Sequence, residues 1–270
     1  MNSGSGSLPR TIDMVIDRLD EIVESSRTEN SRAGFFAALY RQVTIRVRDA
    51  IERGEFDDNE RMERLDVLFA NRYFAAYDAY QRGEKPSLVW QAAFDAARLW
   101  RPVFLQHLLL GMNAHINLDL AIAAAESAAG EDIEELEIDF MAINAILSDL
   151  LEVVQMKINH LSPAFGLLDR FGGRADEAIM NFSIRKARDE AWEFTQHLAG
   201  LEESEREETI SDRDRRMKRL ADLVLNPGWF VSTLAFVVRV FERKNVGETL
   251  DMLSSALNKA EGARETIWEI

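Results

Sequence analysis

The chain has 270 residues, no cysteine, and 47 acidic against 32 basic residues, which give it a formal net charge of −15. The absence of cysteine excludes disulfides and thiolate chemistry. The acidity disfavours nucleic acid and anionic membrane surfaces as partners, because both are bound through basic side chains. The chain is long enough for one sizeable hydrophobic core, and no linker rich in serine, proline or glycine divides it.

The two ends of the chain differ in composition from its middle. Residues 1–8 predict a disordered tail, and residues 9–270 predict one helical domain, in which residues 202–270 form a candidate C-terminal helical appendage. The N-terminus lacks the apolar core of a signal peptide. The longest apolar run, residues 229–238, is about half as long as a membrane span requires. We therefore expect a soluble, cytoplasmic protein without a membrane span.

Apolar residues recur at helical spacing through most of the chain, and glycines and prolines separate these runs. No stretch shows the alternation that is typical of strands, and there is no glycine-rich phosphate loop, G-x-S-x-G or HExxH motif. The sequence therefore predicts an all-α, single-domain multi-helix bundle around a buried central helix at residues 102–129. In chain order, the predicted helices span residues 9–25, 35–53, 61–82, 86–100, 102–129, 131–160, 164–171, 176–198, 202–225, 229–243 and 247–267.

The central helix combines an apolar character with several polar side chains. Residues 104–120 (FLQHLLLGMNAHINLDL) are apolar on nearly every face, which is typical of a buried helix. A buried polar group without a partner is strongly unfavourable. The partners are therefore either protein groups or a bound ion or ligand, and we expect the functional site on this helix. Its polar residues are His107, Asn113, His115, Asn117 and Asp119.

The spacing of these residues suggests a metal site. His115 and Asp119 are four residues apart, so on a straight α-helix they lie on one face, about 6 Å apart along the axis. Zinc or another divalent metal could bridge them, and a structural hydrogen bond between them is the alternative. His107 lies about 12 Å before His115 and would serve a second ion or be a core histidine with protein partners. Gly111, between the two histidines, predicts the close approach of another backbone or of a ligand.

Further polar residues are candidates for supporting roles. Asn113 and Asn117 are expected to bond outward to other helices, and His160 precedes a Ser-Pro break, where it could cap a helix end. Arg188 could hold an anionic group or pair with nearby acids. The remaining supporting candidates, which could face the histidines or serve at the surface, are Asn71, Tyr73, Asp78 and Asp149.

The C-terminal part of the chain contains one predicted ion pair. Arg239 and Glu242 are three residues apart within the apolar stripe of the last helical hairpin. Residues at this spacing are neighbours on a helix. We expect a buried ion pair.

Three segments together resemble a known family. They are LLLGMNAHINLDL at residues 108–120, NRYF at residues 71–74 and ARDEAW at residues 187–192. The chain resembles, over about residues 60–200, a family of uncharacterised bacterial proteins that share a GMNAHIN-x-DL signature. This resemblance implies a domain of unknown function and no particular activity.

A second resemblance is mechanistic. Gly111, His115 and Asp119 are similar to the G-x3-H-x3-D helix of the zinc-dependent phospholipase C and single-strand nuclease group, which are all-helical metal hydrolases. The resemblance implies that His115 and Asp119 are zinc ligands. The chain departs from that pattern in two places. LAIAAAES follows Asp119, where that group has Pro-x-His. The later His-x3-Glu of that group is present here only in the reversed order, Glu193-x3-His197.

These observations support two hypotheses of different classes. The first is a metal-dependent hydrolase of an ester or phosphoester, in which a zinc-type ion on His115 and Asp119 activates a bound water. Further ligands would come from His107, Asp78 or Asp149. The second is a non-catalytic helical module that binds a small molecule or a protein partner, with the polar residues of the central helix in structural roles.

Overall fold

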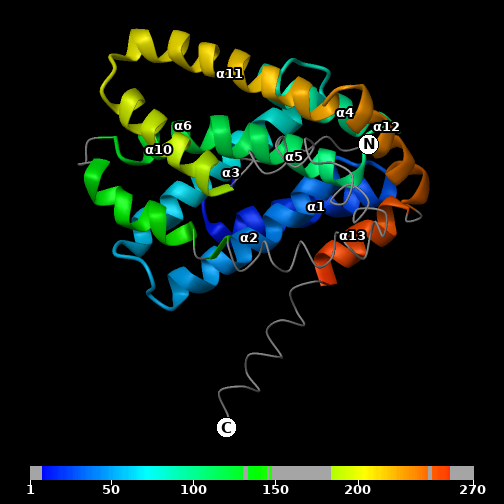
Figure 1. Ribbon diagram of the computed structural model, residues 1–270. Coiled ribbons are helices and arrows are strands. Elements are labelled where there is room, and N and C mark those ends of the chain that lie inside the picture. Colours follow the sequence, from blue (N-terminus) through cyan, green and yellow to red (C-terminus); the bar gives the residue numbers. More distant parts are fainter. Residues whose placement is uncertain (1–7, 130–132, 145, 148–183, 243–244, 256–270) are drawn as a thin grey trace.

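The computed structural model describes residues 8–129, 133–144, 146–147, 184–242 and 245–255. Every regular element in these ranges is a helix, so the all-α prediction is confirmed (Figure 1). Residues 133–144 and 146–147 are helical as well. The elements are α1 (Ile12–Thr28), α2 (Gly34–Glu52), α3 (Asn59–Gln81), α4 (Leu88–Ala97), α5 (Phe104–Ala114), the π-helix η1 (His115–Asp119), α6 (Leu120–Ser127), α10 (Ile184–Ala199), α11 (Glu203–Leu225), α12 (Trp229–Phe241) and α13 (Val246–Ser255).

The continuous run α5–η1–α6 forms the centre of the bundle. Helices α3 and α10 pack against α6, while α2, α4 and α11 pack against α5, and α13 returns to α1 and α2. Figure 1 shows α11 along one side of this central run and the α1–α2 pair on the other. The central run is therefore covered by elements from both halves of the chain.

The predicted burial of the central helix is confirmed. Among the described helices, Phe104–Ser127 has the length and apolar character of a membrane span, but 94% of its most apolar window is buried inside the protein. Burial of this extent is typical of the core helix of a bundle. The apolar faces of the surrounding helices pack against it in two main clusters, and the central run contributes residues to both.

Local signals in the sequence explain most helix boundaries. The side chains of Thr11, Asp58 and Ser87 accept hydrogen bonds from backbone amides in the first turns of α1, α3 and α4. Gly54 and Gly83 follow α2 and α3 with φ angles of 69° and 78°, a conformation that favours glycine. Helix α4 ends at residue 97 rather than at the predicted residue 100, and the amides of Arg98 and Leu99 bond to carbonyls three residues earlier in a tightened last turn.

Three carboxylates from distant parts of the chain hold helix N-termini. Asp139 accepts hydrogen bonds from the two amides that precede α3, at 2.7 and 3.0 Å. Asp214 accepts from the first two amides of α4, at 2.7 and 2.9 Å, and Glu242 accepts from the first amide of α5 at 3.1 Å. Helix N-termini favour negative charge because their first amides lack partners within the helix. These contacts link elements that are far apart in the sequence.

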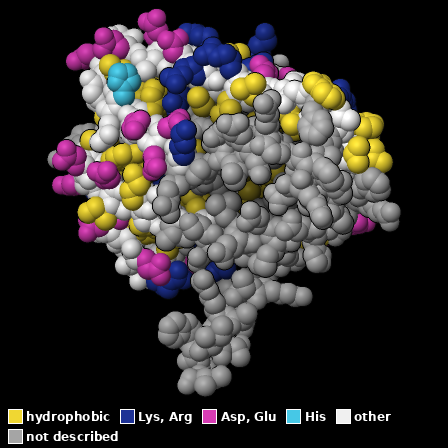
Figure 2. Space-filling model, in the orientation of Figure 1, with side chains coloured by type: hydrophobic (Ala, Val, Ile, Leu, Met, Phe, Trp, Pro, Cys, Tyr) yellow, Lys and Arg dark blue, Asp and Glu magenta, His cyan; other side chains and the backbone are white. Residues whose placement is uncertain are grey.

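Figure 2 shows where the charged side chains of the described residues lie on one face of the molecule. On the face shown in Figure 2, acidic and basic side chains of the described residues lie interspersed, with apolar side chains between them. Exposed large apolar residues include Trp100, Trp229 and Val240. The acidic side chains visible on this face therefore do not form a single patch.

Several predictions from the sequence fall on residues outside the described ranges. They are the tail at residues 1–7, most of the predicted helix at 131–160, the short helix at 164–171, and the last residues of the chain. The candidate residues Asp149 and His160 lie there too.

Candidate functional site

His115 and Asp119 mark the two ends of η1, where the central helix departs from α-helical geometry. The backbone amide of Leu120 donates to the carbonyl of His115, five residues earlier, instead of to the residue four earlier. Such a π turn is frequent at functional positions. It also changes the directions in which its side chains point, relative to those on a regular α-helix. His115 and Asp119 are both buried, with about 3% of each residue exposed.

The carboxylate of Asp119 is held by two side chains of other helices. Its Oδ2 accepts a hydrogen bond from the Trp90 indole N–H at 2.7 Å, and its Oδ1 accepts one from Arg72 Nε at 3.3 Å. The distance from His115 Nδ1 to Asp119 Oδ2 is 3.7 Å, which is too long for a hydrogen bond. Asp119 therefore joins α3 and α4 to the central helix.

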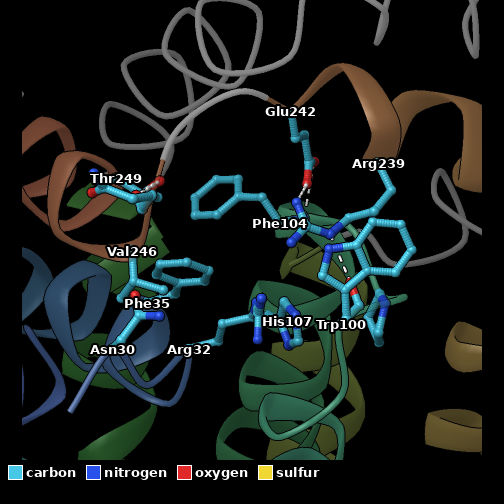
Figure 3. Close-up of a pocket in the computed structure, with 12 residues that line it drawn as sticks. Asn30, Arg32, Phe35, Trp100, Phe104, His107, Arg239, Glu242, Val246 and Thr249 are labelled. Carbon is cyan, nitrogen blue, oxygen red and sulfur yellow. Dashed lines mark hydrogen bonds and ion pairs between the residues drawn. The ribbon is translucent and has the colours of Figure 1, made fainter.

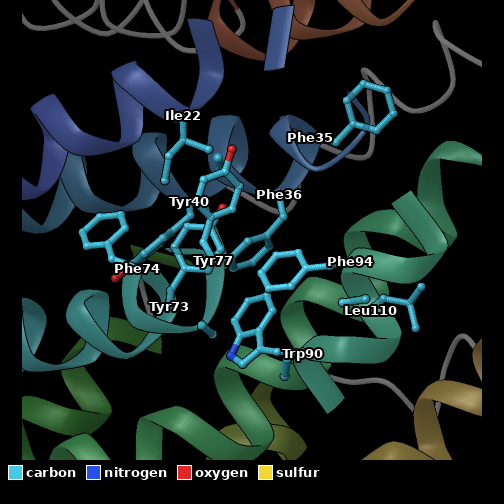
Figure 4. Close-up of a cluster of buried hydrophobic side chains, with 14 of the residues drawn as sticks. Ile22, Phe35, Phe36, Tyr40, Tyr73, Phe74, Tyr77, Trp90, Phe94 and Leu110 are labelled. Atoms are coloured by element: carbon cyan, nitrogen blue, oxygen red, sulfur yellow. The ribbon is translucent and has the colours of Figure 1, made fainter. Parts of the chain in front are cut away.

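The His115 imidazole lies among aromatic rings. It stacks on Phe69 with a centroid distance of 3.5 Å and an interplanar angle of 8°, and the Tyr40 ring is 4.4 Å away. Figure 4 shows Tyr40 with Phe36, Tyr73 and Trp90 in one buried cluster, and these three rings lie 5.5–6.2 Å from His115. Neither ring nitrogen has a hydrogen-bond partner among the described residues. Burial lowers the pKa of His115, which Asp119 opposes in part, so the ring is held neutral.

Gly111 is closely approached, but by a side chain and not by the backbone or ligand that the sequence predicted. A Cβ atom at this position would lie 2.5 Å from Cγ of Phe36. Because Gly111 has no side chain, the Phe36 ring of α2 packs directly against the backbone of α5.

The two asparagines of the central helix bond to each other and to α11. Asn117 Nδ2 donates to Asn113 Oδ1 at 3.0 Å, and Asn113 Nδ2 donates to the carbonyl of Met217 at 2.9 Å. Arg213 Nε donates to the carbonyl of Asn117 at 2.9 Å. The predicted outward bonding holds for the side chain of Asn113, whereas the side chain of Asn117 bonds within the central helix and only its backbone carbonyl contacts α11.

The other supporting candidates on α3 have partners away from the histidines. Asp78 is paired with Arg18 at 2.7 Å, and Asn71 Nδ2 donates to the carbonyl of Pro9 at 3.0 Å. Tyr73 does lie in the aromatic cluster, with its ring 6.2 Å from His115. Within the described part of the chain, no group of three or more histidine, aspartate or glutamate side chains is placed to hold a metal ion.

Arg188 is buried on α10 and is bound by the helix at residues 133–144. Its Nε donates to Asn144 Oδ1 at 2.6 Å, its Nη2 donates to the carbonyl of Phe140, and its guanidinium lies 4.4 Å from the centroid of the Phe140 ring. Burial lowers the pKa of Arg188 to about 10. The Nε and Nη2 donors of Arg188 thus bond to groups of the protein and not to an anionic ligand.

A cavity of about 180 Å³ lies at the other end of α5, around His107 (Figure 3). Its wall is formed by the segment before α2, the start of α5 and the α12–α13 hairpin. The wall contains aromatic rings, two arginines, one glutamate and several amide and hydroxyl groups. The lining residues are Asn30, Arg32, Phe35, Trp100, Pro102, Phe104, His107, Arg239, Glu242, Asn245, Val246 and Thr249.

His107 is a buried histidine without a hydrogen-bond partner. Only 6% of the residue is exposed, and neither ring nitrogen makes a hydrogen bond of ordinary geometry to a described residue. Burial lowers its pKa to about 3, and the positive charges of Arg32 and Arg239 add to this effect, which the Pro102 carbonyl opposes weakly. The imidazole is therefore neutral at physiological pH.

The chain can be assigned to a family. Residues 12–227 match a family described as a family of unknown function (DUF5995). The chain belongs to this family. No curated protein and no solved structure matches it.

The DUF5995 match covers only part of the cavity wall. It includes α1 to α11, and with them Arg32, His107 and the His115–Asp119 region. Helix α12, which carries Arg239 and is followed directly by Glu242, lies beyond the matched residues, as does α13. The α5 side of the cavity thus belongs to the matched region, and the opposite side does not.

The charged side chains of the wall divide into a pair and one unpaired group. Arg239 Nη1 lies 3.2 Å from Glu242 Oε2, both side chains are largely buried, and the predicted buried ion pair is confirmed. Arg239 Nε also donates to the carbonyl of Trp100 at 2.7 Å. Arg32 makes no ion pair or side-chain hydrogen bond with a described residue. Burial and the nearby Arg239 lower the pKa of Arg32, and Glu242 offsets this only in part.

A second, smaller cavity of about 20 Å³ lies behind His107. It reaches Gly111, Phe36 and Trp90, and Arg32 and His107 line both cavities. A space of this size holds about one water molecule. Sequence reasoning did not identify Arg32, because nothing in its local sequence distinguishes it from a surface arginine.

Proposed function

We propose that this DUF5995 protein is a non-catalytic helical module that binds a small molecule in the cavity around His107. The observation that carries the proposal is His107 itself, a buried neutral imidazole at the cavity wall, neither nitrogen of which makes a hydrogen bond of ordinary geometry to a described residue. An unpaired buried polar group destabilises a folded protein. A ligand that bonds to this ring would remove that penalty.

The size and lining of the cavity support this function. Small-molecule sites are mostly apolar and carry a few polar groups that orient the ligand. An engineered apolar cavity of about 150 Å³ accommodates benzene, and the cavity here is about 180 Å³. Its aromatic residues Phe35, Trp100 and Phe104 supply the apolar part, and Arg32 and His107 supply the polar part.

The geometry favours this function over the metal-dependent hydrolase. Both oxygens of Asp119 already accept hydrogen bonds, from Trp90 and Arg72. His115 is stacked among rings and is not bonded to Asp119. The resemblance to the zinc-dependent phospholipase C and single-strand nuclease group stays a prediction, which metal analysis tests. We further propose that the GMNAHIN-x-DL run marks the structural centre of the fold, since its side chains join α2, α3, α4 and α11.

Substitution of His107 by phenylalanine tests the binding function. Phenylalanine keeps a ring at this position and removes both nitrogens. We expect H107F to raise the free energy of unfolding by about 1 kcal/mol, because an unpaired buried polar group is removed. We also expect it to weaken the binding of benzoate, benzamide or benzyl alcohol by roughly 3- to 10-fold, the effect of one neutral hydrogen bond.

Fluorescence and thermal unfolding provide the measurements. Binding is followed by tryptophan emission, since Trp100 lines the cavity, and W100F identifies the part of the signal that comes from this residue. Unfolding is measured in the absence of the probe molecules. If none of the three probes binds the wild type saturably at millimolar concentration, the proposed function is wrong. If H107F is less stable than the wild type, the His107 imidazole does not carry the penalty on which the proposal rests.

A further inference from the structure

The cavity wall contains one cation, Arg32, that forms no ion pair with any residue in the described part of the chain. Glu242 compensates Arg239, since the two form an ion pair at 3.2 Å. The other oxygen of Glu242 accepts a hydrogen bond from the first amide of α5. His107 carries no charge at neutral pH. The guanidinium of Arg32 therefore leaves the wall with one net positive charge.

Arg32 and His107 present their polar atoms to the same space. Both side chains line the main cavity and the smaller one behind it. Figure 3 shows the Arg32 side chain extending from the start of α2 toward the His107 ring. A guanidinium offers planar N–H donors that match the two oxygens of a carboxylate. A neutral imidazole can add one N–H donor.

The rest of the wall suits a flat apolar group. Phe35 and Phe104 pack edge to face with a centroid distance of 5.2 Å, and Phe35 also contacts the His107 ring at 5.9 Å. The Arg239 guanidinium lies 5.2 Å from the centroid of the Trp100 ring. Cationic and aromatic groups thus lie side by side in one cavity.

We propose that the ligand of this cavity is a small monocarboxylic acid, with its carboxylate on Arg32 and His107 and its apolar body against the aromatic wall. This inference rests on the proposed binding function and adds the chemical class of the ligand. A single negative charge balances the charge of Arg32. A doubly charged phosphate would leave one negative charge uncompensated beside Glu242, so the geometry disfavours it.

Benzoate and benzamide are suitable probes, because they have nearly the same shape and differ in charge. Each is titrated into the full-length protein near neutral pH by isothermal titration calorimetry, with wild type, R32Q and R219Q. Arg219 is an exposed residue of α11 and serves as the matched control. We expect wild type to bind benzoate at least tenfold more tightly than benzamide, as a charge-assisted hydrogen bond requires.

The variants then assign the charge preference to one residue. R32Q is expected to lose at least tenfold in benzoate affinity and to leave benzamide affinity unchanged, whereas R219Q behaves like the wild type. If benzoate and benzamide bind equally well and R32Q alters neither, the carboxylate proposal is overturned while the binding function stands. If sulfate, which is doubly charged at this pH, displaces benzoate from the wild type, the preference for a single negative charge is wrong. If no probe binds the wild type, both proposals fail.

Discussion

At the scale of single residues, the central helix contains two kinds of buried polar side chain. Asp119 has partners for both oxygens, while His115 and His107 have none among the described residues. The sequence predicted that these residues are buried and that Asp119 needs partners. It did not predict that Trp90 and Arg72 are the partners, because pairs between helices are not encoded in the spacing within one helix.

Substitutions of Asp119 and His115 separate a structural role from a metal site. D119N should lower the free energy of unfolding by about 2 kcal/mol, because its amide leaves the Trp90 or Arg72 donor without an acceptor. H115F should have little effect, since it keeps the stack on Phe69 and removes nitrogens that have no partner. The measurements are urea unfolding and elemental analysis of protein purified without chelators. A stoichiometric metal in the wild type that is absent from both variants would establish the metal site instead.

At the scale of elements, glycine and proline signals placed most helix ends within a few residues. The ends of α2 and α3 follow from Gly54 and Gly83, and the break after α11 follows from Pro227 and Gly228. The π turn at residues 115–119 was not predicted. An added residue in one turn leaves the apolar pattern almost unchanged when the helix is buried on every face, so periodicity carries no signal of it.

Gly111 gives a prediction about the packing of α2 against α5. G111A should lower the free energy of unfolding by about 1–3 kcal/mol, because the new methyl group would overlap the Phe36 ring and its Cβ. This result is opposite in sign to the gain of about 1 kcal/mol that alanine normally brings to a helix. Thermal unfolding of G111A and G200A provides the comparison, since a Cβ at Gly200 would have no neighbour closer than 3.7 Å. Equal stability of G111A and wild type would contradict the close packing.

At the scale of the whole molecule, the fold class was predictable and the cavity was not. The helical periodicity is a local property, and it identified an all-α bundle with a buried central helix. The cavity combines Arg32 and His107 with Arg239 and Glu242, which are more than a hundred residues further along the chain. Arg239 and Glu242 bond to the carbonyl of Trp100 and to the first amide of α5, and α13 packs against α2. These contacts between distant segments bring the groups together, and no local pattern encodes them.

The carboxylates that bind the N-termini of distant helices also contribute to the assembly of the whole molecule. Asp214 of α11 bonds to the amides of Leu88 and Val89, and α11 packs along α4. We expect D214A to lower the free energy of unfolding by about 2 kcal/mol, because one buried and one partly buried amide lose a charged acceptor. For a chain of this size, that change corresponds to a decrease in melting temperature of about 4–8 °C. Ser87 still accepts from the third amide of α4, so the helix itself should remain.

Hydrogen exchange locates the effect of Asp214. The amides of Leu88 and Val89 should exchange faster in D214A than in the wild type. The exchange rates of amides in the middle of α5 should change only as far as the free energy of global unfolding changes. Asp212, on the exposed face of α11, pairs with Arg215, and D212A is the matched control. Its free energy of unfolding should stay within about 0.5 kcal/mol of the wild type. If D212A and D214A are equally stable, the contact between α11 and the start of α4 does not contribute to holding the two halves of the bundle together.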